Sequence, residues 1–231
     1  MAGFWTLYRA SVLDYQSPIV NFGKNINLGT LEKEACRQLV TEPMAMLDIR
    51  YASKDLVEKI ITETGQLANL IAIVCDEMLK NLANDQRVLN AEDVTRALHS
   101  WEVRTALATW MQLSDDEQIN RLNRIIVYAT VKRGKFRLSD VINVLKKQGC
   151  VYTNEQLSQS LNFLELAFII RREEEYYSYC VPLFRKRLMK EELEILLEQE
   201  SSLQKNLSTT RNKRIKPSLS NIYSFFSGCT H

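Results

Sequence analysis

Seven glycines and four prolines are few for a chain of 231 residues, and this scarcity argues against a loop-rich, sheet-rich enzyme. Leucine, isoleucine, alanine, glutamate, lysine and glutamine instead recur at helical spacing. With 45% hydrophobic residues, the chain has enough apolar material for one or two domains of roughly 100 to 200 residues each. The composition therefore predicts a mainly α-helical protein.

The sequence also lacks paired cysteines and long apolar runs. Its five cysteines lie far apart without a Cys-x-x-Cys pair, and the two histidines are His99 and His231, so we expect reduced thiols and no zinc site. No stretch approaches the roughly 18 uncharged apolar residues that span a bilayer, and no secretory signal pattern follows Met1. We therefore expect a cytoplasmic protein with no membrane partner.

A phosphate-binding loop is absent as well. Such a loop needs the pattern Gly-x-x-x-x-Gly-Lys-Ser/Thr, because its backbone amides, lysine and hydroxyl must converge on phosphates and magnesium, and the sequence contains no such pattern. The acidic runs 115–117 and 173–175 are better explained as the first turn of a helix and the tip of a hairpin than as catalytic carboxylates. We predict no catalytic residues, no metal site and no cofactor.

Charge is distributed unevenly along the chain. Residues 1–120 carry 11 basic and 17 acidic side chains, whereas residues 121–190 carry 14 and 6. The second segment therefore has an excess of eight positive charges, which belongs to one candidate domain rather than to a tail.

Helix start and stop signals divide residues 30–112 into a bundle with short loops. We expect a helix over about residues 31–42, ended by Pro43 because proline disfavours a helical conformation in the residue before it. The other signals are the N-caps Ser53 and Asn90, the terminating glycine Gly65, and an apolar helix over residues 66–82 that is buried on most sides.

The basic segment shows a different order of elements. Ser114 and Glu117 form a capping box that opens a helix, a second helix is expected over residues 139–148, and Thr153 caps a third that runs to about Leu166. Two apolar, aromatic runs then flank residues 173–175 as a hairpin. Three helices followed by a hairpin predict a winged-helix domain over residues 113–190. An acidic helix over residues 188–203 and a mobile tail complete the segment 191–231.

Short motifs in a fixed order connect this sequence to a known family. From residue 2 to residue 98 they are Ala2-Gly3-Phe4, Ser17-Pro18, Asn21-Phe22, Glu34-Ala35, Glu42-Pro43, Tyr51, Thr64-Gly65, Leu70-Ile71, Asp93-Val94 and Ala97-Leu98. Their order and separation resemble the C-terminal part of a prokaryotic AAA+ ATPase of the origin-recognition-like and STAND-like branch. More loosely, Tyr128, Leu161, Leu164, Leu188 and the run 181–184 resemble the winged helix fused to such ATPases.

The resemblance implies a division of the chain and a missing half. According to the resemblance, residues 1–29 correspond to the sensor 1 strand and its following loop, residues 30–112 correspond to a lid-like bundle, and residues 113–190 correspond to a winged helix. The family's Walker A and Walker B half would precede these segments. Its lid carries a sensor 2 arginine just after the glycine, but the matching position here is Asn69, which has no positive charge.

The basic residues of the predicted winged helix are candidates for a phosphate-tracking surface or a partner-binding surface: Lys132, Arg133, Lys135, Arg137, Arg171 and Arg172. The expected recognition helix, residues 153–166, has Glu155 and Glu165 but no lysine or arginine, which disfavours sequence-specific contacts to guanine. A merely solvated basic face, or one that docks the acidic bundle, is an open alternative.

Three functions remain open at this stage. The first is a non-catalytic interaction or regulatory module with a protein partner and no autonomous ATP hydrolysis. The second is a winged-helix module that binds nucleic acid without sequence specificity. The third is one half of a split ATPase, completed by a separate chain that supplies the phosphate loop and magnesium ligands.

Overall fold

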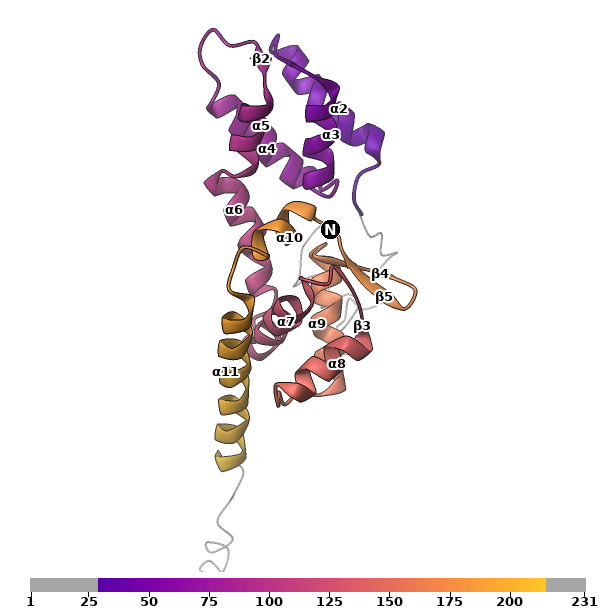
Figure 1. Cartoon of the computed structure of the whole chain (residues 1–231), viewed down its shortest axis with the longest axis vertical. Coiled ribbons are helices and arrows are strands. Elements are labelled where there is room, and N and C mark those ends of the chain that lie inside the picture. The colour runs from indigo at the N-terminus through magenta and orange to yellow at the C-terminus, as the bar shows by residue number, and fades with distance from the viewer. Residues whose placement is uncertain (1–28, 215–231) are drawn as a thin grey trace, which may run out of the picture.

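The computed structural model describes residues 29–214, with side chains described as far as residue 205. The leader expected over residues 1–29 lies, apart from Gly29, outside the described residues. Within that range the chain is mainly helical, with a small antiparallel three-stranded sheet. Figure 1 shows a helical bundle at one end of the long axis, the sheet and its helices in the middle, and a long helix at the other end. The predicted fold class is confirmed.

The bundle contains helices α2 (Lys33–Met46), α3 (Lys54–Glu63), α4 (Ala68–Lys80), α5 (Ala91–Leu98) and α6 (Trp101–Ala108). Helix α4 lies at its centre because it contacts the other four. Its buried side chains include Leu70, Ile71, Val74 and Met78, as its continuous apolar pattern predicts. No helix in residues 29–214 is long and apolar enough to cross a membrane.

A short parallel strand pair ties the distal end of the bundle together. Strand β1 (Arg50–Tyr51) follows α2 and pairs with β2 (Val88–Leu89), which precedes α5. The sequence does not predict this pair, because two residues are too few to show a strand alternation.

The end of α2 corrects one prediction. Helix α2 continues through Pro43 to Met46 instead of ending at residue 42. Proline weakens a helix by removing a hydrogen bond and by crowding the preceding turn. Here Met44 is only 1% exposed, and burial of such a side chain contributes roughly 1.5–3 kcal/mol. Core packing of the last turn therefore offsets the local preference.

The basic segment forms a small winged element. Its order is α7 (Glu117–Thr130), β3 (Lys135–Arg137), α8 (Leu138–Lys147), α9 (Asn154–Leu166), β4 (Ile170–Glu173) and β5 (Tyr176–Tyr179). Strand β5 lies between β3 and β4, antiparallel to both. Strand β3 was not expected, and it extends the predicted hairpin to three strands.

Helix α7 starts differently from the prediction. Asp116, not Ser114, is its N-cap, and the Asp116 side chain accepts a hydrogen bond from the backbone N–H of Gln118 at 2.8 Å. The Ser114 hydroxyl, two residues before this cap, accepts instead from the Asp116 N–H at 3.1 Å. Both residues are capping types, and the side chain of Asn120, which bonds the Ser114 backbone at 2.8 and 2.7 Å, fixes which one caps the helix.

The C-terminal part holds two helices where one was expected over residues 188–203. Helix α10 (Pro182–Leu188) starts at a proline in its first turn, and α11 (Leu193–Arg214) follows a short break. Residues 205–214, expected to belong to a mobile tail, continue α11. Helix α11 packs along α7, which is also covered by α8, α9 and the 3₁₀ helix η2 (Thr109–Gln112).

The bundle meets the winged element at Gly65. This residue has φ +61°, and a Cβ added to it would lie 2.4 Å from the Cys180 carbonyl oxygen. Glycine is therefore required both by the left-handed conformation and by the close approach of the two backbones. An ion pair between Lys186 of α10 and Glu63 of α3 lies at the same junction.

Candidate functional site

The three-stranded sheet brings part of the predicted basic cluster onto one face. The register aligns Lys135 with Ser178 and Arg171 in one row, and Arg137 with Tyr176 in another. Side chains in these rows point to the same side because alternate residues of a strand share a face. Lys135, Arg137, Arg171 and Tyr176 thus form what we call the basic sheet face.

The opposite face of the sheet belongs to the core. Phe136 and Tyr177 are buried there, and their rings stack with centroids 5.4 Å apart. Tyr179 is hydrogen-bonded through its hydroxyl to Thr130 of α7 at 2.8 Å, and burial raises its pKa. This packing fixes the sheet on α7 and therefore fixes which side chains reach solvent.

Two cations of the basic sheet face lie over the ring of Tyr176. The Lys135 ammonium lies 4.8 Å from the centroid of the Tyr176 ring, and the Arg137 guanidinium carbon lies 4.4 Å from it. Arg137 also donates to the Tyr176 hydroxyl. Cation–π contacts at exposed sites are worth roughly 0.5–1 kcal/mol, which is enough to hold both cations over the central strand.

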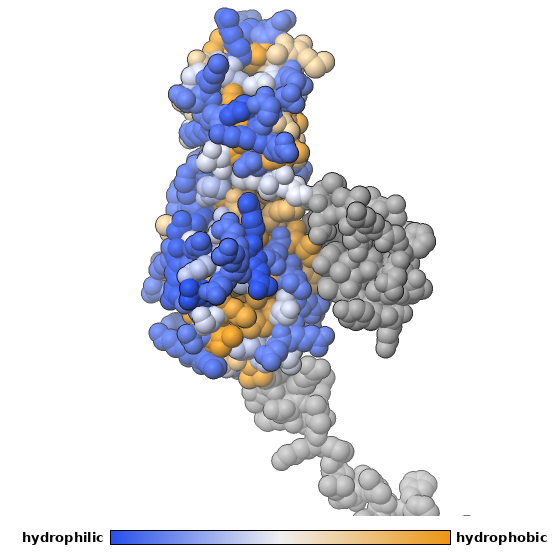
Figure 2. Space-filling view, turned by 90° about the vertical axis from the view of Figure 1, so that its right-hand side faces the viewer, coloured by the Kyte–Doolittle hydropathy of each residue, from blue (hydrophilic) through white to orange (hydrophobic). Residues whose placement is uncertain are grey.

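Two carboxylates partly neutralise this face. Lys135 lies 4.0 Å from Glu173, and Arg137 lies 3.5 Å from Glu175, in side chains that are all about half exposed or more. Such exposed ion pairs are worth roughly 0–1 kcal/mol each. A phosphate oxygen could therefore replace either carboxylate at small cost. In Figure 2 the hydrophilic side chains of the β4–β5 hairpin face the viewer, whereas apolar atoms gather around them.

The other predicted basic residues lie apart from this face. Lys132 pairs with Glu194 of α11 at 3.0 Å, and Arg133 pairs with Asp140 of α8 at 2.9 Å. Arg172 alternates to the core side of β4, where its guanidinium donates to the Glu174 carbonyl at 3.2 Å. None of these three residues lies in the strand rows that form the basic sheet face, so the structure divides the predicted cluster of six into two groups of three.

Helix α9, the expected recognition helix, contributes no cation. Its exposed N-terminal residues are Asn154, Glu155 and Ser158, while Leu161 and Leu164 of its second half are buried. Burial also raises the pKa of the Glu165 carboxyl near its end. The basic sheet face therefore carries three of the predicted cations, whereas α9 carries none.

Asn69, which the sequence resemblance aligns with a sensor 2 arginine, lies exposed in the first turn of α4. An amide there can donate hydrogen bonds but cannot supply the full positive charge that stabilises a transferring phosphate.

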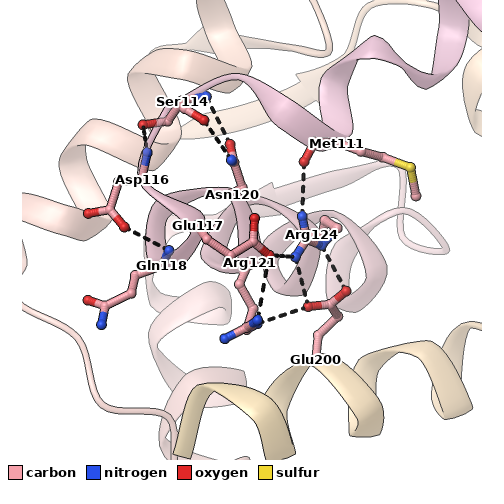
Figure 3. A network of polar contacts seen from close by, with 9 residues as sticks. All are labelled: Met111, Ser114, Asp116, Glu117, Gln118, Asn120, Arg121, Arg124 and Glu200. Atoms are coloured by element: carbon pink, nitrogen blue, oxygen red, sulfur yellow. Dashed lines mark hydrogen bonds and ion pairs between the residues drawn. The ribbon is translucent and has the colours of Figure 1, made fainter. Parts of the chain in front are cut away.

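A second polar cluster, not found from the sequence, joins α7 to α11 and η2. Arg124 forms a two-pronged contact with Glu200 of α11, with N···O distances of 2.8 and 3.1 Å. Its third nitrogen donates to the Met111 carbonyl at 2.9 Å, and Glu117 accepts at 2.5 Å. Figure 3 shows Arg124 enclosed by these three partners. Its side chain is only 10% exposed.

Arg121 adds a second cation to this cluster. It lies 3.3 Å from Glu200 and 3.5 Å from Glu117, so two arginines share two carboxylates. Partial burial acts to raise the pKa of Glu117, but the Arg124 and Arg121 guanidinium groups outweigh it, and the pKa is lowered overall. Every carboxylate in the cluster is neutralised by an arginine, so the cluster joins helices and provides no free base or nucleophile.

The sequence could not reveal this cluster because its parts are far apart. In the sequence, Arg121 and Arg124 lie between the apolar residues of α7, which is typical of side chains that face solvent. The structure instead buries both under α11. Their carboxylate partner is 76 residues downstream of Arg124. Within residues 29–214, no group of three or more His, Cys, Asp or Glu residues is placed to hold a metal ion.

Comparison with known proteins gives a structural match. No protein-family model and no curated protein matches the chain. A solved structure, a Walker-type ATPase of Pyrococcus abyssi, aligns with a TM-score of 0.53 at 16% sequence identity, over 79% of this chain and 49% of that one. The chain has an ATPase-like fold. It spans about half the length of that ATPase, and at this identity the similarity concerns the fold alone.

Proposed function

We propose that this chain is a non-catalytic interaction or regulatory module, with a lid-like bundle and a winged helix similar to the C-terminal part of an AAA+ ATPase. One observation carries the proposal. The chain shares the fold of about half of a Walker-type ATPase, yet its sequence contains no phosphate-binding loop. Asn69 at the sensor 2-like position agrees with a role that does not include ATP hydrolysis.

The partner in this proposal is a protein that carries the phosphate loop. A lid and winged helix have no catalytic electrostatics of their own, because magnesium and the γ-phosphate are held by the other half of such an enzyme. The chain would act by packing against that half and changing its rate. A split ATPase, in which the two chains together form one enzyme, is the limiting case of this proposal.

Calorimetry with magnesium-ATP tests the first part of the proposal. We expect no binding heat with the purified chain at micromolar to millimolar ATP, because the phosphate-binding elements are missing. Micromolar affinity would overturn the proposal and would mean that the chain holds an unrecognised nucleotide site.

Enzyme kinetics test the second part. A phosphate-loop ATPase that copurifies with the chain should change its rate of ATP hydrolysis when the chain is added, and an unrelated phosphate-loop ATPase should not. Equal rates with and without the chain would contradict a regulatory role, and full dependence on the chain would identify a split enzyme.

The basic sheet face supports a second candidate function, binding to nucleic acid without sequence specificity. Its three cations and one tyrosine lie on one surface, and the ion pairs of Lys135 and Arg137 are with exposed carboxylates. Phosphate contacts and an aromatic ring are what such binding uses.

Arg171 and Arg172 provide a matched test of this second function, because they are adjacent but lie on opposite faces of β4. In fluorescence anisotropy with random-sequence DNA, Arg171→Ala should weaken binding several-fold and reduce the slope of log affinity against log salt by about one. Arg172→Ala should leave both nearly unchanged. Equal effects of the two substitutions, or no binding by the unaltered chain, would rule out this face.

A further inference from the structure

The outer face of α6 carries an unusually exposed aromatic side chain. Trp101 is 70% exposed, whereas Trp110, nine residues later, is 3% exposed and packs edge-on against Tyr128 and Phe184 with centroids 5.8 and 5.5 Å away. The Arg104 guanidinium carbon lies 6.0 Å from the Trp101 ring. Exposed tryptophans of this kind are enriched among the residues that dominate protein interfaces.

Small residues follow Trp101 along the same stripe of the helix. Thr105 and Ala108 are exposed and lie four and seven residues further on, so all three side chains share one face. Seven residues correspond to about 10 Å along a helix axis. Small side chains at these positions would allow the backbone of another helix to approach closely.

A hollow lies at the far end of this stripe. It is open to solvent and is lined by Ala108, Thr109, Met111, Gln112, Arg124 and Glu200. The polar groups of its floor are already paired, because Arg124 bonds Glu200, Glu117 and the Met111 carbonyl. An aromatic ring could therefore cover the hollow without leaving those groups unpaired.

We propose that this face binds a second copy of the chain, with the two α6 helices antiparallel and Trp101 of each copy in the hollow of the other. Trp101 projects from one end of this helix face, and the hollow lies two turns away at the other end. When the α6 helices of two copies pair in opposite directions, each Trp101 lies opposite the hollow of the other copy. This arrangement has two-fold symmetry and closes on itself, as most homodimer interfaces do.

Charge and location are compatible with this pairing. The Trp101 end of the face carries Glu102 and Arg104, and the hollow carries Arg124 and Glu200. Each end is neutral, so the antiparallel approach brings no excess of like charge together. In Figure 1, α6 lies at the edge of the molecule where the bundle joins the winged element.

The expected dimer is weak. Helices α6 and η2 together provide 12 residues, fewer than the roughly 20–30 residues a side of a standard interface. We therefore expect association in the micromolar range.

Sedimentation equilibrium of the full chain tests the proposal. The mass should rise from monomer to dimer between low and several hundred micromolar protein. Trp101→Ala should raise the dissociation constant at least about tenfold, and Ala108→Arg, which fills the hollow of each copy, should do the same. Met46→Ala is the matched control, because Met46 is 85% exposed at the distal end of the bundle and should not change the association.

A mixing experiment distinguishes this dimer geometry from nonspecific association. Each of Trp101→Ala and Ala108→Arg should associate with itself much more weakly than the native chain, but a mixture keeps one intact tryptophan facing one intact hollow and should form a mixed dimer more readily than either variant alone. Circular dichroism should show both variants folded. A monomeric native chain, a dimer unaffected by Trp101→Ala, or variants that fail to pair when mixed would each overturn the proposal.

Discussion

At the scale of single residues, Arg124 and Glu200 decide how the long helix α11 is attached. Their side chains are 10% and 18% exposed, and the contact is two-pronged. Such contacts depend on both partners, because a guanidinium left without its carboxylate keeps the cost of its burial and loses the compensating hydrogen bonds.

Glu200→Gln should therefore destabilise the protein by about 2 kcal/mol, since it removes the negative charge and replaces one of two accepting oxygens by a donor beside a guanidinium that remains buried. Urea unfolding measures the loss, and faster hydrogen exchange confined to α11 and α7 would locate it. Glu198→Gln is the control, because Glu198 is exposed on the same helix and should cost little. Equal losses in the two variants would contradict the role assigned to Glu200.

The ionisation of the Glu58 carboxyl makes the free energy of unfolding depend on pH. Hydrogen bonds from Arg37 and then Lys33, at 2.6 and 2.8 Å, lower the pKa of its carboxyl from the usual 4.5 to about 2. A lowered pKa in the folded state means that the contribution is complete above pH 4.5 and is lost as the pH falls towards 2.

The difference in unfolding free energy between the native chain and Glu58→Gln should therefore be largest at neutral pH and should shrink steadily in acid. The effect should be small, because these side chains are well exposed to solvent. Denaturant unfolding at several pH values measures it. A difference that grows in acid would reverse the sign argued here.

At the scale of elements, the best-defined helix start is that of α5. The Asn90 side chain accepts from the backbone N–H groups of Glu92 and Asp93, and the Asp93 carboxylate accepts from the Asn90 N–H in return. Leu89 and Val94 are both fully buried beside this cap.

Asn90→Ala should cost about 1 kcal/mol, because it leaves two backbone donors of the first turn without acceptors. Ser53→Ala at the start of α3 should cost much less, since the Ser53 side chain makes no capping hydrogen bond. Thermal unfolding of the two variants compares these positions. A larger loss at Ser53 would contradict the observed capping.

Elements with complete local signals are the ones that the sequence predicts well. The prediction of Asn90 as an N-cap matches the start of α5, and the prediction of Thr153 and Leu166 as the limits of a helix matches α9. Strand β3 and helix α10 were missed because three and seven residues are too short to show a period. The wrong predictions at Pro43 and Ser114 arose where tertiary contacts outweighed a local preference.

At the scale of the whole molecule, Gly65 controls how closely the bundle approaches the winged element. Gly65→Ala should destabilise the protein by about 2–4 kcal/mol, because a Cβ both strains the left-handed conformation and lies 2.4 Å from a backbone oxygen. Gly29→Ala is the control, since nothing lies within 4 Å of its added Cβ. Calorimetry of both variants tests the prediction, and an unchanged Gly65→Ala protein would contradict it.

The candidate site was predictable only in part at this scale. Sequence reasoning identified all three cations of the basic sheet face, because basic residues cluster along the chain. It could not separate them from Lys132, Arg133 and Arg172, since the separation depends on the strand register and on carboxylates of α8 and α11. Tyr176 was treated as part of an apolar run, and only the pairing of β3 with β5 places it between two cations.

Glu200 lies 76 positions after Arg124, so the two partners are added to the growing chain at different times. Synthesis proceeds at roughly 5–20 residues per second, so about 4–15 seconds separate the addition of the arginine from that of its carboxylate. During that interval helices α2 to α6 have already been synthesised, whereas Arg121 and Arg124 of α7 still lack their partner on α11. A nascent chain therefore attaches α11 last, and a chain that ends before residue 200 lacks the carboxylate that holds α11 on α7.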